Sequence, residues 1–157
     1  MSAKTNACRV LDQAKISYSI HEYEWNEEAL DAITVAGKIG LPPEQIFKTL
    51  VIKGDKTGIV MACVPGDKEL VFKALAALSG NKKVEMVPVK DIQGLTGYIR
   101  GGVSPLGVKK TYPLYLHESI LELDPVSISA GKRGVQIFLK GSDLVHVTKG
   151  TICKITK

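Results

Sequence analysis

Residues 47–65, FKTLVIKGDKTGIVMACVP, form the stretch that decides how this chain folds. Two runs rich in β-branched and apolar residues, 47–54 and 58–65, flank a turn-like GDKTG segment, and this pattern predicts a β-hairpin. The second run is apolar on both faces, which is typical of a strand covered on both sides. We therefore expect residues 58–65 to form a central strand.

Helical and strand patterns follow each other irregularly along the rest of the chain. The predicted helices are a first one carrying Ala3, Ala7, Val10, Leu11 and Ala14 at helical spacing, residues 31–39 ending near Gly40, 68–80 with Gly80 as the stop, one turn at 90–95, and 142–148 with Ser142 as the cap. The other predicted strands are 17–23, 84–89, 112–118, 126–131 and 134–141. Because strands outnumber helices without strict alternation, we predict an α+β fold with a mixed, strongly curved sheet rather than a doubly wound parallel one.

Length and composition are those of an ordinary globular domain. The 157 residues fit one domain over 1–157, with 45% hydrophobic and 24% charged residues. The N-terminus lacks the apolar core of a signal peptide, and no segment approaches the roughly 20 apolar residues of a membrane span, which predicts a cytoplasmic protein. The three cysteines are far apart and form no CxxC pair, so neither a disulfide framework nor a metal site is predicted.

Positive charge is modest but clustered. The net charge is +5, and many basic residues occur in pairs or beside glycines: Lys82, Lys83, Arg100, Lys109, Lys110, Lys132 and Arg133. This arrangement favours a phosphate-bearing partner, while a solvated lysine-rich surface is the alternative.

Residues 97–110, GYIRGGVSPLGVKK, form a loop with four glycines. A phosphate-binding P-loop is excluded because Val108 stands where that motif needs lysine. A nucleophile elbow around Ser104 is disfavoured because Pro105 and Leu106 precede the next glycine, and the three histidines show no triad pattern. What remains is a loop that offers backbone N–H groups, with Pro105 restricting its shape and Ser104 adding a hydroxyl. Such donors stabilise a carbonyl oxygen that gains negative charge.

Lys48 complements this loop. Strand alternation puts Lys48 on the face of Leu50 and Ile52, opposite Phe47, Thr49 and Val51. A lysine on an apolar face either extends its ammonium to water or lies in a pocket that binds a ligand oxygen.

Four ordered segments carry a resemblance to a known family: FKTLV, KKVEM, TGYIRGGVSPLGVKK and SAGKRG. In this order and spacing they resemble the YbaK/EbsC family of Cys-tRNA(Pro) deacylases, relatives of the editing domain of prolyl-tRNA synthetases. The resemblance implies a barrel-like mixed sheet with flanking helices, and hydrolysis of the ester between cysteine and the terminal ribose of tRNA(Pro), with Cys-tRNA(Cys) as a further substrate. It also implies catalysis without a cofactor, a metal or a protein nucleophile, with the substrate thiol or water attacking. A complex with prolyl-tRNA synthetase remains open.

The resemblance also implies a set of site residues. The catalytic lysine matches Lys48, and the GxxxP loop spans Gly101 to Pro105, with the amides of Gly101 and Gly102 holding the carbonyl. The implied substrate-binding residues are Tyr23, Thr49, Ser104, Pro105 and Ser129. Two positions depart from the family pattern: Ala130 replaces a glycine, and Gln136 replaces an aspartate found in some relatives. Gln136 puts an acid role at that position in doubt.

Two other functions stay open at this point. One is a deacylase for another mischarged tRNA, such as Ala-tRNA(Pro). The other is a non-catalytic module that binds tRNA ends or a synthetase, against which the presence of both Lys48 and the complete GxxxP loop argues.

Overall fold

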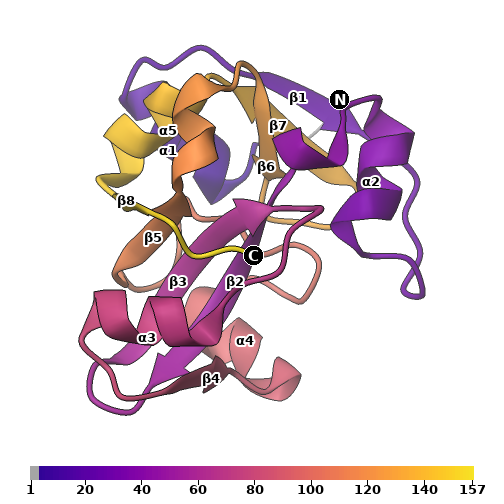
Figure 1. The fold of residues 1–157 in the computed structure, drawn as a ribbon. Coiled ribbons are helices and arrows are strands. Elements are labelled where there is room, and N and C mark those ends of the chain that lie inside the picture. Colours follow the sequence, from indigo (N-terminus) through magenta and orange to yellow (C-terminus); the bar gives the residue numbers. More distant parts are fainter. Residues whose placement is uncertain (1–3) are drawn as a thin grey trace.

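A computed structural model describes residues 4–157 (Figure 1). The helices are α1 (Asn6–Gln13), α2 (Ala32–Ile39), α3 (Phe72–Ser79), α4 (Val89–Thr96) and α5 (Gly141–Thr148), with short 3-10 helices at Pro43–Gln45 and Glu118–Glu122. The strands are β1 (Ser19–Glu22), β2 (Phe47–Gly54), β3 (Gly58–Pro65), β4 (Val84–Met86), β5 (Leu114–His117), β6 (Val126–Ser129), β7 (Val135–Leu139) and β8 (Thr151–Cys153). The predicted α+β fold is confirmed.

The strands form two sheets. Five strands have the order β4-β2-β3-β5-β8, in which β5 runs parallel to both β3 and β8, and three antiparallel strands have the order β1-β7-β6. The predicted hairpin is confirmed as β2 and β3, and β3 is the central strand of the larger sheet. An isolated bridge between Ile46 and Ser127 joins the sheets, which do not close into a barrel. The predicted mixed sheet is confirmed, and the description as barrel-like holds only loosely because the two sheets stay separate.

Local chemistry explains where α2 begins and ends. Asp31 caps its first turn by accepting the N–H of Thr34 at 3.0 Å, and Gly40 ends it in the left-handed region at φ +78°. The predicted helix over 31–39 and the stop at Gly80 are both confirmed.

Most predicted strands are a few residues shorter in the structure, and three other boundaries differ for reasons that the contacts show. Helix α3 starts only at Phe72, because Leu70 bridges to Thr156 and the Val71 N–H donates to the Ile155 carbonyl. Strand β4 stops at Met86, because Pro88 caps α4, which is a two-turn helix rather than one turn. Helix α5 begins at Gly141 with Lys140 as its N-cap, so Ser142 is not the cap. Ala3 of the predicted first helix lies outside the described residues.

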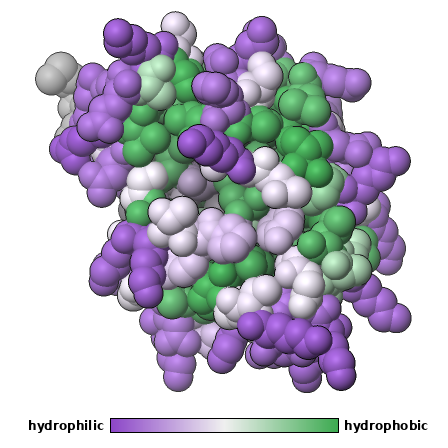
Figure 2. Space-filling view, turned by 90° about the vertical axis from the view of Figure 1, so that its left-hand side faces the viewer, coloured by the Kyte–Doolittle hydropathy of each residue, from purple (hydrophilic) through white to green (hydrophobic). Residues whose placement is uncertain are grey.

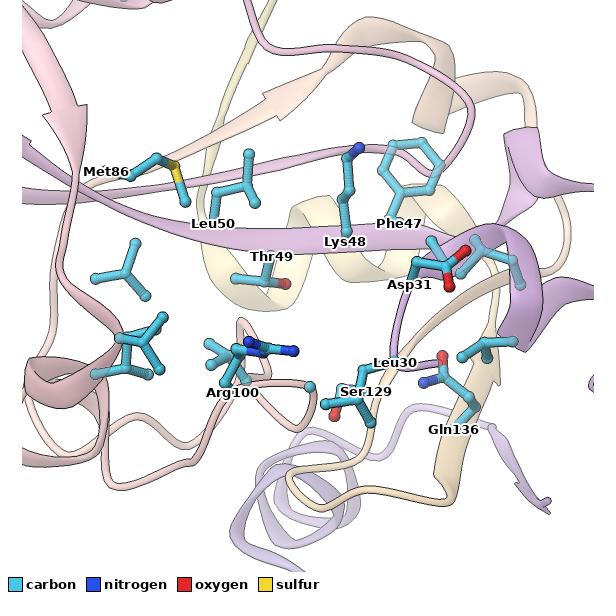
Figure 3. Close-up of a pocket in the computed structure, with 18 of the residues that line it drawn as sticks. Leu30, Asp31, Phe47, Lys48, Thr49, Leu50, Met86, Arg100, Ser129 and Gln136 are labelled. Carbon is cyan, nitrogen blue, oxygen red and sulfur yellow. The ribbon is translucent and has the colours of Figure 1, made fainter. Parts of the chain in front are cut away.

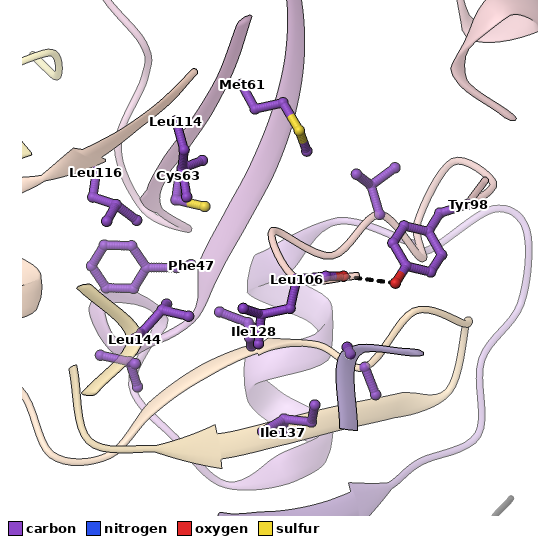
Figure 4. Close-up of a cluster of buried hydrophobic side chains, with 14 of the residues drawn as sticks. Phe47, Met61, Cys63, Tyr98, Leu106, Leu114, Leu116, Ile128, Ile137 and Leu144 are labelled. Atoms are coloured by element: carbon purple, nitrogen blue, oxygen red, sulfur yellow. Dashed lines mark hydrogen bonds between the residues drawn. The ribbon is translucent and has the colours of Figure 1, made fainter. Parts of the chain in front are cut away.

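The main hydrophobic core lies between the two sheets (Figure 4). It joins Phe47 and Cys63 of the larger sheet to Ile128 and Ile137 of the smaller one. A second cluster lies on the other face of the larger sheet, where Ile52 packs with residues of α3. Strand β2 therefore contributes side chains to both clusters.

The surface on the side of α5 and β8 is mixed in character. In Figure 2, apolar and intermediate side chains reach the surface in the middle of this face, and hydrophilic side chains surround them. No helix in the described part of the chain is long and apolar enough to cross a membrane.

Candidate functional site

A pocket of about 350 Å³ lies between β2, the start of α2, the glycine loop and the smaller sheet (Figure 3). Five of the predicted site residues line it: Tyr23, Lys48, Thr49, Gly101 and Ser129. The departing residue Gln136 lines it as well, whereas Gly102, Ser104 and Pro105 do not. The fold therefore brings together residues that are far apart in the sequence.

One edge of β2 is open at this pocket. Strand β4 pairs only with Ile52, Lys53 and Gly54, and the bridge to β6 lies at Ile46, before the strand begins. Within residues 4–157, no strand pairs with residues 48–50 on that edge. The Val51 carbonyl accepts the Val87 N–H at 3.1 Å on the same edge. Because backbone groups alternate in direction along a strand, Thr49 points its N–H and C=O toward the same open edge. A ligand in the pocket meets main-chain donors and acceptors there.

Lys48 and Thr49 project from opposite sides of β2. Figure 3 shows Lys48 beside Leu50, and Thr49 on the side of Arg100 and Ser129. The Lys48 side chain is half-buried at the pocket edge, and its ammonium has no ion-pair or hydrogen-bond partner among the described residues. A charge without a protein partner at a pocket can bind an anionic or carbonyl oxygen of a ligand.

The glycine loop leaves one of the two predicted donor amides without a hydrogen-bond partner among the described residues. Gly101 lines the cavity at φ +84°, a conformation that suits glycine. Its N–H has no partner within residues 4–157, whereas the Gly102 N–H donates to the Ile99 carbonyl at 2.9 Å. Of the two predicted donors, only the Gly101 amide is available for a ligand in this conformation.

Buried contacts in the rest of the loop hold the backbone around Gly101 in place. Ser104 is fully buried, and its Oγ accepts the Leu106 N–H at 3.3 Å. The Tyr98 hydroxyl donates to the Leu106 carbonyl at 2.7 Å, and burial raises the pKa of Tyr98 to about 12. Pro105 is buried beside them. These contacts fix the shape of the loop and keep the Ser104 hydroxyl away from the pocket.

The smaller sheet forms another wall of the pocket through Ser129 and Gln136. The Ser129 Oγ accepts the Gly131 N–H at 3.1 Å, and the Gln136 Oε1 accepts the Ser127 hydroxyl at 2.7 Å. Gln136 is buried and neutral, so this wall offers polar atoms without an acid at that position.

Sequence reasoning missed two charged residues of the pocket. Arg100 lines it, and its position directly before Gly101 was the available signal. Asp31 is the one carboxylate among the lining residues of the described chain. Its Oδ1 accepts the Thr34 hydroxyl and its Oδ2 accepts the Thr34 N–H. Both bonds lower the pKa of Asp31, and the bond from the hydroxyl has the larger effect. Because it is occupied in starting α2, Asp31 is poorly placed to act as a base.

Thiols and histidines contribute no nucleophile to the lining. Cys63 lies below Thr49 at 3.3 Å from its hydroxyl, and burial raises the pKa of the Cys63 thiol to about 12. No cysteine or histidine lines the pocket within residues 4–157. In the same residues, no group of three or more His, Cys, Asp or Glu side chains is arranged to hold a metal ion.

Comparisons with known proteins agree with this architecture. Residues 26–147 match the model of the aminoacyl-tRNA editing domain. A protein of Enterococcus faecalis, named as a candidate Cys-tRNA(Pro)/Cys-tRNA(Cys) deacylase, EbsC, is 48% identical over 98% of this chain and 93% of its own length. A proline–tRNA ligase of Maridesulfovibrio salexigens is 27% identical over 92% of this chain, which spans only 25% of that enzyme.

A solved structure supports the fold. The crystal structure described as a candidate trans-editing enzyme for prolyl tRNA synthetase superposes with a TM-score of 0.83 at 24% identity, over 99% of both chains. The matched segment contains Lys48, Thr49, the glycine loop and Ser129. From the family model and the near full-length relative, we conclude that this chain belongs to the aminoacyl-tRNA editing domain family.

Proposed function

We propose that this protein hydrolyses the ester that joins cysteine to the terminal ribose of tRNA(Pro), and of tRNA(Cys) as a further substrate. The observation that carries the proposal is the 48% identity to the Enterococcus faecalis protein over nearly the whole chain. The pocket supports it, because Lys48, Thr49 and Gly101 all line one cavity, with Lys48 and Thr49 on opposite sides of β2. The enzyme would act in the cytoplasm, where aminoacyl-tRNAs are made, and a complex with prolyl-tRNA synthetase would deliver its substrate.

The residues have separate roles in this proposal. Lys48 binds an oxygen of the tRNA 3′ end and keeps the ester in register. The Gly101 N–H faces the scissile carbonyl and stabilises the negative charge that develops on its oxygen. Tyr23 and Ser129 line the space for the aminoacyl group and the terminal nucleoside.

The attacking group comes from the substrate. Its thiol sulfur bonds to the carbonyl carbon, the bond from that carbon to the ribose 3′ oxygen breaks, and the thiol proton passes to the ribose oxygen. The strained cyclic thioester that leaves is then opened by water to give free cysteine. The buried, protonated Cys63 and the buried Ser104 support this route, since neither offers a nucleophile to the cavity.

This route explains selectivity without a close-fitting pocket. Cysteine and proline are similar in size, and an apolar pocket separates isosteres poorly. Only cysteine carries the thiol, so alanine and serine remain uncleaved even when they enter the site.

A panel of substrates tests the function. Purified protein is mixed with tRNA(Pro) carrying Cys, Ala, Ser or Pro, and the release of each amino acid is followed under single-turnover conditions. We expect rapid release of cysteine and slow release of the other three. Preferred release of alanine would assign the chain to the alternative deacylase, and no release from any substrate would favour the non-catalytic module.

A second prediction concerns nucleophiles of the protein. Ser104→Ala, Cys8→Ala, Cys63→Ala and Cys153→Ala should each retain most of the Cys-tRNA(Pro) hydrolysis of the wild type, because none of these side chains lines the pocket. Melting curves identify any variant that loses activity by unfolding. Trapping an acyl-enzyme on one of these residues, seen as a mass increase of the intact protein, would contradict the substrate-thiol route.

A further inference from the structure

Arg133 contacts two chain segments that each contribute residues to the pocket lining. Its Nε donates to the Arg100 carbonyl oxygen at 2.8 Å, its Nη1 lies 3.6 Å from a carboxylate oxygen of Glu27, and its guanidinium carbon lies 5.2 Å from the centre of the Trp25 ring. The Arg133 side chain is only 16% exposed. One side chain therefore links the glycine loop to the segment that leads to α2.

The backbone around Arg133 is packed as closely as its side chain. A Cβ at Gly134 would lie 2.6 Å from Cδ1 of Trp25, and a Cβ at Gly102 would lie 3.0 Å from Cα of Lys132. The Tyr23 N–H also donates to the Gly134 carbonyl at 2.9 Å. Glycines at these positions let the turn at residues 131–134 touch both neighbouring segments, which holds Arg133 in place.

The contact to Arg100 bears directly on the Gly101 amide. The Arg100 carbonyl and the Gly101 N–H belong to one peptide unit, which is planar and trans, so the two groups point in opposite directions. A donor that holds the carbonyl from one side therefore fixes the direction of the N–H on the other side. Because the donor is cationic, it also polarises the peptide and strengthens the N–H as a hydrogen-bond donor.

We propose that Arg133 is a positioning residue that orients and polarises the Arg100–Gly101 peptide, so that the Gly101 N–H faces the carbonyl of the substrate. This inference rests on the proposed function, since it assigns the same N–H to the scissile ester. Arg133 acts through the loop and does not itself touch the substrate.

The chemistry of this position requires arginine. A planar guanidinium can donate from Nε to the carbonyl, approach Glu27 through Nη1 and present its face to Trp25 at the same time. A lysine ammonium is a single point charge and cannot make the three contacts together. We therefore expect the conservative substitution to fail.

Arg133→Lys and Arg133→Met test the proposal, with Lys132→Ala as the matched control. Lys132 is the neighbouring cation, it is exposed, and it has no ion-pair or hydrogen-bond partner among the described residues. Both Arg133 variants should lower the single-turnover rate by about 10- to 100-fold while the affinity for uncharged tRNA(Pro) stays near the wild-type value. The control should keep both quantities.

Two spectroscopic measurements are independent of activity. Trp25 is the one tryptophan in the sequence, so the emission of the protein reports whether the guanidinium still covers its ring. The ¹H–¹⁵N amide resonance of Gly101 reports the polarisation of the peptide. Both signals should change in the Arg133 variants and stay unchanged in Lys132→Ala, with melting temperatures close to that of the wild type.

Specific results of these measurements would overturn the positioning role of Arg133 or the proposed function. A wild-type rate or an unmoved Gly101 resonance in folded Arg133 variants would overturn the positioning role. Weakened tRNA binding with an unchanged rate at saturation would also overturn it, because it would make Arg133 a phosphate ligand. A wild-type protein that cleaves no member of the substrate panel would overturn the proposed function instead, whatever the Gly101 resonance shows.

Discussion

Lys48→Ala is expected to lose nearly all Cys-tRNA(Pro) hydrolysis, with a fall of about 100-fold or more in the single-turnover rate. Lys48 stands half-buried at the pocket edge, and its ammonium has no protein partner among the described residues. Its loss would leave the tRNA 3′ end without the charged donor that keeps the ester in register. Because the substitution breaks no hydrogen bond or ion pair of the ammonium within residues 4–157, the melting temperature should change by only a few degrees.

Lys53→Ala is the matched control for this variant. Lys53 lies on the same strand, is exposed and carries the same charge, but it does not line the pocket. It should keep the wild-type rate. Lys48→Arg should restore little activity, since a planar guanidinium does not replace a compact ammonium. Deacylation by Lys48→Ala at close to the wild-type rate would show that the active site has been assigned wrongly.

Gly101→Ala should lower the rate by about 100-fold through the geometry of the loop. The residue sits at φ +84°, and its new Cβ would lie 3.0 Å from Cδ1 of Leu30. The left-handed conformation costs an alanine about 1–2 kcal/mol, and relief of this strain would turn the N–H away from the pocket. Single-turnover assays and thermal melts measure the two effects.

Gly80→Ala separates backbone strain from loss of function. Gly80 has a nearly identical φ of +82°, its Cβ would meet nothing within 4 Å, and it ends α3 away from the pocket lining. It should lose similar stability and keep its activity. If Gly101→Ala also kept the wild-type rate, the loop amide would not be part of the catalytic machinery.

Local signals in the sequence were sufficient for several elements. The hairpin of β2 and β3 followed from two apolar runs around a turn, and α2 followed from a periodic segment that ends at Gly40. These features depend on residues close together in the chain. Because these local patterns are strong, the α+β fold could be predicted from the sequence.

Boundaries that depend on distant contacts were not predictable. The residues before α3 are drawn into pairing with Ile155 and Thr156 at the other end of the chain, which shortens the helix. Similarly, Gly141 starts α5 early because its N–H donates to the Leu123 carbonyl and its missing Cβ leaves room for the carbonyl of Ile120. No local sequence pattern indicates contacts with residues so distant in the chain.

The site residues likewise fall into those that a local sequence pattern indicated and those that it did not. Lys48 stood out because strand alternation placed a charge on an apolar face, whereas Tyr23 and Ser129 came from the resemblance alone. Two contacts depend on the folded structure and have no sequence signal. The Gly102 N–H is used within its own turn, and Arg133 donates to the Arg100 carbonyl. A glycine-rich loop indicates that amides are presented, but it does not indicate which amide is left for the ligand.

The unpaired edge of β2 has a consequence for the solution behaviour of the protein. A strand with a bare edge is a template for pairing with another chain, and proteins commonly guard such edges with a charged side chain, lysine above all. Lys48 stands between the bridge to β6 at Ile46 and the pairing with β4 at Ile52, where no strand of the described residues pairs with β2 on this edge, and its ammonium discourages a second copy from adding a strand. Lys48→Ala removes this guard together with the proposed ligand contact. Light scattering at the assay concentration therefore belongs beside every rate measured on that variant, so that self-association is not mistaken for lost catalysis.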